Sequence, residues 1–71
     1  MRAAAAQVSH ETYDIFKRFP NGKTLWRESV QGREHAIERA KELLAASSPF
    51  ECEFAVMHVA TNATVAVLKA P

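Results

Sequence analysis

The chain has 71 residues and a formal net charge of +1 at pH 7, with a pI near 8.0. This length predicts one domain built around a single small core. The balanced charge excludes a global field of the kind that draws a protein to nucleic acid or to an anionic membrane. Any electropositive surface must therefore be local.

The sequence predicts neither the disulfides nor the metal sites that often stabilise small domains. Its single cysteine, Cys52, cannot form an internal disulfide, which favours a reducing compartment. No stretch approaches the 18 or more apolar residues of a membrane span, and the segment 1–6 is too short for the apolar region of a signal peptide. We expect a cytoplasmic protein without a membrane partner. Small chains without disulfides or bound metals often gain stability by association, so we expect a homodimer.

Two strands and a tight turn are predicted near the start of the chain. Residues 1–10 are rich in alanine and lack a sustained apolar period, so we expect a flexible tail before one domain at residues 11–71. Residues 13–19 and 24–30 are rich in aromatic and branched side chains typical of strands. Pro20-Asn21-Gly22 between them predicts a three-residue hairpin loop with glycine in the left-handed conformation.

Counting outward from this loop predicts the register of the hairpin. The expected pairs are Phe19 with Lys23, Phe16 with Trp26, and Ile15 with Arg27. Tyr13, Ile15 and Phe19 then share the opposite face with Leu25. Both faces carry apolar side chains, and the register alone leaves open which face a helix covers. The remaining apolar face is the one that a dimer would use.

A helix is predicted from Arg33 to about Ser47, after Gly32 as a cap or break, because this segment lacks proline and glycine. Its apolar residues recur at intervals of three and four, as expected for a helix with one packed side. They are Ala36, Ile37, Ala40, Leu43 and Leu44. Ser47-Ser48-Pro49 is predicted to end the helix, since proline disfavours helical geometry in the residue before it.

The C-terminal third predicts a second hairpin. Phe50, Cys52, Phe54 and Val56 alternate with Glu51, Glu53, Ala55 and Met57, which is the period of a strand. Residues 55–59 are apolar on both sides, so this part of the strand is expected to be covered on both faces or to enter an interface. A turn at Thr61-Asn62-Ala63 and a last strand at Val65–Leu68 follow. The chain is thus predicted to be an α+β domain of order ββαββ, a four-stranded antiparallel sheet with one helix on one face.

The spacing of the structural residues resembles a known pattern. Tyr13-x-Ile15-Phe16-x-Arg18-x-Pro20-x-Gly22-x-x-Leu25-Trp26-x-Glu28-x-Val30-x-Gly32 is similar to short bacterial proteins of unknown function with a hairpin-helix-hairpin order. The resemblance covers residues 13–57 and implies the fold, without an activity. A hairpin followed by a helix with Ala-x-x-x-Ala is also similar to the arm-binding domains of phage integrases. This chain departs from that family because it has two strands before the helix and two after it.

A basic and aromatic group on the first hairpin is the main candidate for a binding surface. Its cations are Lys17, Arg18, Lys23, Arg27 and Arg33. Cations neutralise phosphates and aromatic rings stack on bases, so a hairpin with both types of residue is compatible with nucleic-acid binding. The same residues also suit a solvated sheet surface whose charges prevent aggregation. We select Phe16, Arg18, Trp26 and Arg27 as the candidate interface or binding residues.

No residue pattern predicts a catalytic, cofactor or metal site. His10, His35 and His58 lack the short spacing of metal ligands, and Cys52 fits a buried strand position better than a nucleophile paired with a histidine. Acidic side chains form two short rows. Glu51 and Glu53 share one face of the strand, where a paired-carboxylate site is an alternative, and Glu34, Glu38 and Glu42 lie along the helix. Both rows are typical of solvated surfaces, although the helical row could also meet the basic hairpin of a partner subunit.

We therefore expect a small non-enzymatic binding protein that self-associates through its sheet. No cofactor and no small-molecule substrate is indicated. Nucleic-acid binding through the hairpin 13–30 is the alternative function. A small enzyme with a site at a subunit interface is a further alternative, which would need a pocket containing Cys52 or His58.

Overall fold

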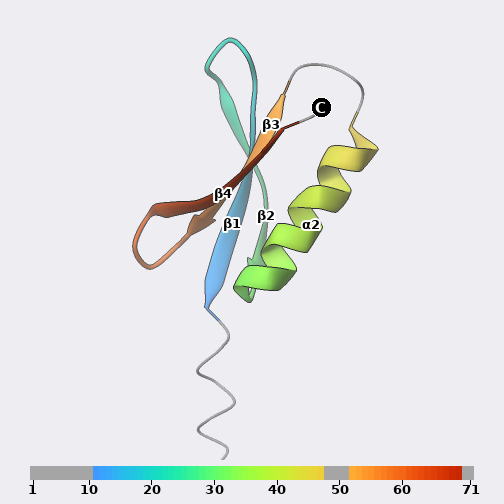
Figure 1. Cartoon of the computed structure of the whole chain (residues 1–71). Helices are drawn as coiled ribbons and strands as arrows, with labels where there is room; N and C mark the ends of the chain where they lie inside the picture. Colours follow the sequence, from blue (N-terminus) through green and yellow to red (C-terminus); the bar gives the residue numbers. More distant parts are fainter. Residues whose placement is uncertain (1–10, 48–51, 70–71) are drawn as a thin grey trace, which may run out of the picture.

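The computed structural model describes residues 11–47 and 52–69, and these form one antiparallel sheet with a helix against one side (Figure 1). The strand order is β2-β1-β3-β4. The predicted ββαββ α+β fold is confirmed, whereas the predicted tail of residues 1–10 lies outside the described residues. The elements are β1 (Thr12–Arg18), β2 (Thr24–Gln31), α2 (Arg33–Ala46), β3 (Glu53–His58) and β4 (Ala63–Lys69).

The loop between β1 and β2 has the geometry that its sequence predicts. The Gly22 N–H donates to the Phe19 carbonyl at 2.9 Å, and the Phe19 N–H donates to the Lys23 carbonyl at 2.9 Å. Gly22 has a φ of +92°, a conformation that side chains with a Cβ rarely adopt. Asn21 adds a local brace, because its Oδ1 accepts the Lys23 N–H at 2.9 Å.

The register of this hairpin follows the prediction near the loop and departs from it farther away. Phe16 pairs with Trp26 as expected. Ile15 pairs with Glu28, so the predicted pair of Ile15 with Arg27 is wrong. A β-bulge after Trp26 leaves Arg27 as the extra residue of β2. The bulge moves Glu28 to the side of the sheet on which α2 lies.

The helix α2 begins and ends where its local sequence allows. Gly32 precedes it with a φ of +92°, and the Gly32 carbonyl accepts the Ala36 N–H at 2.9 Å. Ser47 closes the last turn, since its N–H donates to the Leu44 carbonyl and its Oγ donates to the Leu43 carbonyl. The observed end at Ala46 agrees with the prediction, while Ser48 and Pro49 lie outside the described residues.

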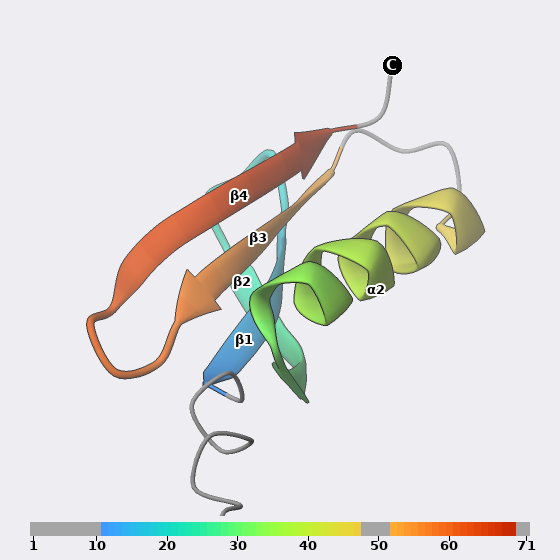
Figure 2. The same cartoon turned by 60° about the horizontal axis from the view of Figure 1, so that its bottom comes forward.

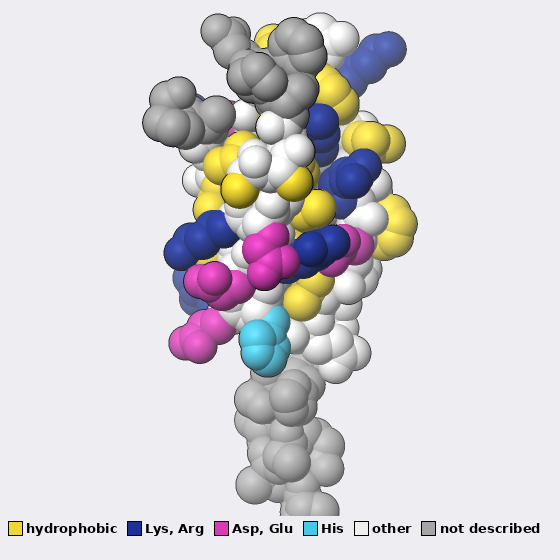
Figure 3. Space-filling view, turned by 90° about the vertical axis from the view of Figure 1, so that its right-hand side faces the viewer, with side chains coloured by type: hydrophobic (Ala, Val, Ile, Leu, Met, Phe, Trp, Pro, Cys, Tyr) yellow, Lys and Arg dark blue, Asp and Glu magenta, His cyan; other side chains and the backbone are white. Residues whose placement is uncertain are grey.

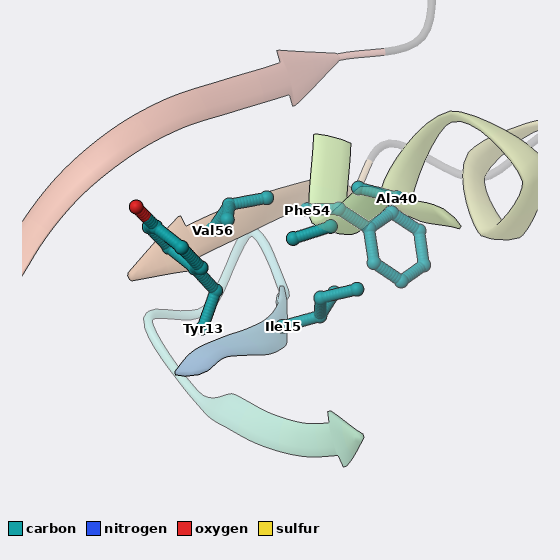
Figure 4. Close-up of a cluster of buried hydrophobic side chains, with 6 residues drawn as sticks. Tyr13, Ile15, Ala40, Phe54 and Val56 are labelled. Carbon is teal, nitrogen blue, oxygen red and sulfur yellow. The ribbon is translucent and has the colours of Figure 1, made fainter. Parts of the chain in front are cut away.

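The core lies between α2 and the two central strands (Figure 4). Ile15 and Val56 are fully buried, and Phe54 is 2% exposed. The helix contributes Ala36 and Ala40, both at 0% exposure. Their small side chains allow the helix backbone to approach the sheet closely. The helix therefore covers the face of Tyr13 and Ile15, which answers the question that the register left open.

The second hairpin turns earlier than expected. The turn spans residues 59–62, and β4 already begins at Ala63, so the predicted turn at residues 61–63 is shifted. Asn62 takes a φ of 59°, and its N–H donates to the His58 carbonyl at 2.7 Å. Asparagine tolerates this left-handed geometry, which explains why the last turn residue is Asn62. The predicted strand positions Phe50 and Glu51 lie outside the described residues.

Candidate interaction surface

One side of the sheet has no helix against it (Figure 2), and we call this side the open face. Side chains of alternate strand residues point to opposite sides, so the pairing defines which residues share the open face. They form three rows, and each row crosses the sheet from β2 through β1 and β3 to β4. The polar row is Ser29, Asp14, Met57 and Thr64; the apolar row is Trp26, Phe16, Ala55 and Val67; the charged row is Thr24, Arg18, Glu53 and Lys69.

The apolar row runs across all four strands without a polar interruption. Trp26 is 54% exposed and Val67 is 43% exposed, and these two residues lie on the two edge strands. Ala55 is only 1% exposed, because its small side chain lies low between its neighbours Phe16 and Val67. The row thus has two aromatic side chains followed by two smaller aliphatic ones. The row is therefore exposed mainly at its two ends, and apolar area gathered on one face in this way marks interaction sites more often than isolated exposed residues do.

The polar row fixes the position of the Trp26 indole. The Trp26 Nε1–H donates to Asp14 Oδ1 at 3.3 Å, and the Ser29 hydroxyl donates to the same oxygen at 2.5 Å. The N–H end of the ring is thereby satisfied, while more than half of the residue remains exposed. An aromatic ring held in this way presents apolar area with little loss of side-chain entropy on binding.

The charged row is a chain of ion pairs. Arg18 Nη1 lies 3.1 Å from Glu53 Oε2, and Lys69 Nζ lies 3.8 Å from Glu53 Oε1. The Glu53 side chain is 25% exposed, against 37% for Arg18 and 72% for Lys69. The open face therefore carries both signs of charge beside its apolar row.

The structure brings together three of the four predicted binding residues. Phe16, Arg18 and Trp26 share the open face, whereas Arg27 is the exposed extra residue of the bulge. Lys17 points to the helix side, where its Nζ lies 5.2 Å from the centre of the Phe19 ring. The basic group predicted from the sequence is thus divided between two faces of the sheet.

Two members of the apolar row, Ala55 and Val67, are not among the predicted binding residues. The sequence places both on apolar strands, and Ala55 is part of the segment 55–59 that is predicted to be covered on both faces or to enter an interface. This prediction fits the buried Ala55 and is wrong for Val59, which is 45% exposed in the turn after β3. The sequence pattern does not predict the strand order. In the structure β3 lies beside β1, and this pairing aligns Ala55 with Phe16.

The outer surface of α2 carries alternating charges. Figure 3 views the molecule from the helix side and shows acidic and basic side chains next to one another. Arg39 binds the Glu28 carboxylate with two hydrogen bonds, of 2.8 and 3.2 Å, and it also donates to Glu42 at 3.0 Å. Lys41 lies 3.5 Å from Glu38. Two of the three glutamates in the helical row thus have cationic neighbours within the chain, as expected for a solvated face.

The ion pair of Glu28 and Arg39 predicts a small pH effect. The hydrogen bonds from Arg39 lower the pKa of the Glu28 carboxyl in the folded chain. A group with a lowered folded pKa stabilises the fold above its unfolded pKa, and this contribution disappears as the pH falls through the folded value. Glu28→Gln is therefore expected to lower the free energy of unfolding at pH 7, by less than about 1 kcal/mol because both side chains remain partly exposed to water. Urea unfolding should show the difference at pH 7 and a smaller one near about pH 3. A loss of the same size at both pH values would contradict this account.

His58 and Cys52 lie at opposite ends of the β3 segment. His58 Nδ1 is 2.9 Å from the Thr61 hydroxyl, Nε2 pairs with the Glu11 carboxylate, and the ring packs on Tyr13 with centroids 5.0 Å apart. Cys52 is half-buried against the core. Six residues of extended chain span roughly 20 Å, so these two side chains cannot act on one substrate atom within one copy. Among residues 11–47 and 52–69, no group of His, Cys, Asp and Glu side chains has the geometry of a metal site.

Comparisons with known proteins give no relative for this chain. No family model, no curated protein and no solved structure matches it. Within the part of the chain that the structure describes, no helix has the length and apolar character needed to cross a membrane.

Proposed function

We propose that this chain is a small non-enzymatic interaction protein that associates with a second copy of itself through the open face. The observation that carries the proposal is the apolar row, which crosses all four strands on the side that α2 leaves uncovered. A cytoplasmic location is part of the proposal and is supported by the single cysteine of the chain.

The charges of the open face favour a second copy over a partner of one charge sign. The charged row contains two cations and one carboxylate, and Asp14 adds a second carboxylate in the polar row. A strongly acidic or basic partner would meet like charges on this face. A surface with both signs can instead complement itself after a two-fold rotation.

The small core is a second reason for association. Among the described residues, the core cluster on the helix side has six buried members, two of which are alanines. Such a core removes little apolar surface from water, so it contributes little to the stability of one folded copy. Association of two folded copies would stabilise the folded state by mass action. Covering Trp26 and Val67 would add apolar burial that one copy lacks.

Nucleic-acid binding is supported less well. Arg18 already donates to Glu53, and the exposed Trp26 ring has the Asp14 carboxylate at its edge. Phosphates would have to approach these carboxylates to reach the aromatic side chains. The cations of the hairpin also point to both sides of the sheet, which does not favour a single path for a nucleic-acid strand.

A pair of matched variants tests the proposed function. Trp26 and Leu25 are neighbours on β2, 54% and 48% exposed, and they lie on opposite faces of the sheet. Trp26→Ser is expected to weaken self-association roughly 30-fold, the effect of losing an interface anchor of about 2 kcal/mol. Leu25→Ser should change it less than about 3-fold, because the open face is intact.

Sedimentation equilibrium over a range of concentrations measures both variants against the unsubstituted chain. A concentration-dependent dimer that is lost in Trp26→Ser and kept in Leu25→Ser would support the proposal. A monomer at every concentration, or equal weakening by both substitutions, would overturn it.

A further inference from the structure

The order of side chains in the apolar row restricts how two open faces can meet. Trp26 and Phe16 carry large aromatic rings, and Ala55 and Val67 have smaller aliphatic side chains. Two packed sheets lie about 10 Å apart, and this space must be filled by side chains from both. Large residues of one copy therefore fit best over small residues of the other.

Only one of two simple two-fold arrangements meets this condition. An axis parallel to the strands sets β2-β1-β3-β4 over the reverse order of the second copy. Trp26 then lies over Val67 and Phe16 lies over Ala55, and both contacts occur twice. An axis along the apolar row would instead set Trp26 over Trp26 and Ala55 over Ala55, which separates the sheets on one side and leaves voids on the other.

The charged row favours the same arrangement. With the axis parallel to the strands, Arg18 of each copy lies over Glu53 of the other, while Lys69 lies over Thr24. Arg18 has five N–H donors and uses one of them for Glu53 of its own chain, so it can also reach a second carboxylate. The two arginines and two glutamates would form one alternating group of four charges. The other axis would place Arg18 over Asp14 of the second copy, which is also an ion pair, but it would place Glu53 over the Met57 thioether and Lys69 over Thr64, so Glu53 would gain no cation from the second copy.

We infer that two copies pack face to face about a two-fold axis parallel to the strands, with Trp26 and Phe16 over Val67 and Ala55 and with Arg18 paired to Glu53 across the interface. This arrangement rests on the proposed function, and it adds the orientation of the two copies and the ion pairs that set it. The strands of the two sheets cross at the small angle, about 30°, that aligned sheet packing favours.

Charge reversal with mixing tests the orientation. In a homodimer of the Arg18→Glu variant, the new carboxylate of each copy would lie over the Glu53 carboxylate of the other. In a homodimer of the Glu53→Arg variant, the new guanidinium group of each copy would lie over Arg18 of the other. Each variant alone is expected to associate at least about 10-fold more weakly than the unsubstituted chain. An equimolar mixture restores opposite charges at both crossing positions, so a heterodimer should form with an affinity within about 3-fold of the original. Native mass spectrometry separates the two homodimers from the heterodimer, because the variants differ in mass.

The outcomes separate the inference from the proposed function. A heterodimer in clear excess over both homodimers would support the inferred orientation. If the unsubstituted chain dimerises but the mixture forms no excess of heterodimer, the orientation is wrong and the proposed function stands. If the unsubstituted chain never dimerises, both are wrong.

A second measurement does not depend on the charge-reversed chains folding. In a Cys52→Ser background, Thr24→Cys and Lys69→Cys chains are mixed and treated with a short bismaleimide cross-linker. The inferred axis brings Thr24 of one copy over Lys69 of the other, so cross-links should join unlike chains. Cross-linking of each chain to itself in preference to the other would overturn the orientation.

Discussion

Phe54→Ala is expected to lower the free energy of unfolding by about 3–5 kcal/mol, the usual cost of removing a buried phenylalanine ring. Phe54 is 2% exposed, and its ring lies between the central strands and the helix beside Ala40 (Figure 4). The other buried residues of the core cluster are few, so they cannot collapse far into the space that the ring leaves. Because a single core in a chain of this length rarely supplies more than about 3–5 kcal/mol, this variant is expected to be partly unfolded at 25 °C.

Phe19→Ala is the matched control for this prediction. Phe19 is 36% exposed and lies beside the first loop, where the Lys17 ammonium lies 5.2 Å from the centre of its ring. Its removal should cost only about 1–2 kcal/mol, from the cation-π contact and the partial burial of the ring. Urea unfolding monitored by circular dichroism, at one fixed protein concentration, compares the two variants. A loss for Phe54→Ala no larger than that for Phe19→Ala would show that the core is not placed as described.

Ala40→Leu is expected to destabilise the fold by about 1–3 kcal/mol or more, through overpacking. Ala40 has 0% exposure and lies on the side of α2 that packs against the sheet. Leucine and alanine both favour helices, so a change in helix propensity cannot account for such a loss. The added atoms would push α2 away from Ile15 and Phe54, and the packing of both residues would suffer.

Ala45→Leu makes the same substitution on an exposed position of the same helix. We expect its effect on the free energy of unfolding to stay within about 0.5 kcal/mol. Equal effects of Ala40→Leu and Ala45→Leu would contradict the close approach of α2 to the sheet.

Local sequence patterns predicted most of the fold. The Pro20-Asn21-Gly22 loop, the extent of the helix and the alternation in β3 all depend on residues that are close in sequence. The bulge was missed because nothing between Trp26 and Glu28 marks an extra residue: Arg27 suits an edge strand with or without a bulge. The ion pair of Glu28 with Arg39 shows why the bulge matters, because it carries Glu28 to the helix side.

The candidate site was predictable only in part, for a topological reason. The pair of Phe16 with Trp26 is set by a short hairpin and could be counted from the loop. The other half of the apolar row comes from β3 and β4, and it is aligned by the pairing of β1 with β3. These strands are separated by the whole helix, so local patterns did not predict which residues of β3 face Phe16.

The position of Trp26 permits one direct measurement of the central claim, that the open face joins two copies. Trp26 is the only tryptophan of the chain, and it lies on the open face with 54% of its surface exposed in one copy. Its fluorescence emission therefore reports on this face alone. On dilution from a concentrated solution, we predict that the emission shifts to longer wavelength and becomes more sensitive to a soluble quencher, as two copies separate and the indole meets water. An emission spectrum of an exposed tryptophan that does not change with protein concentration would contradict the claim.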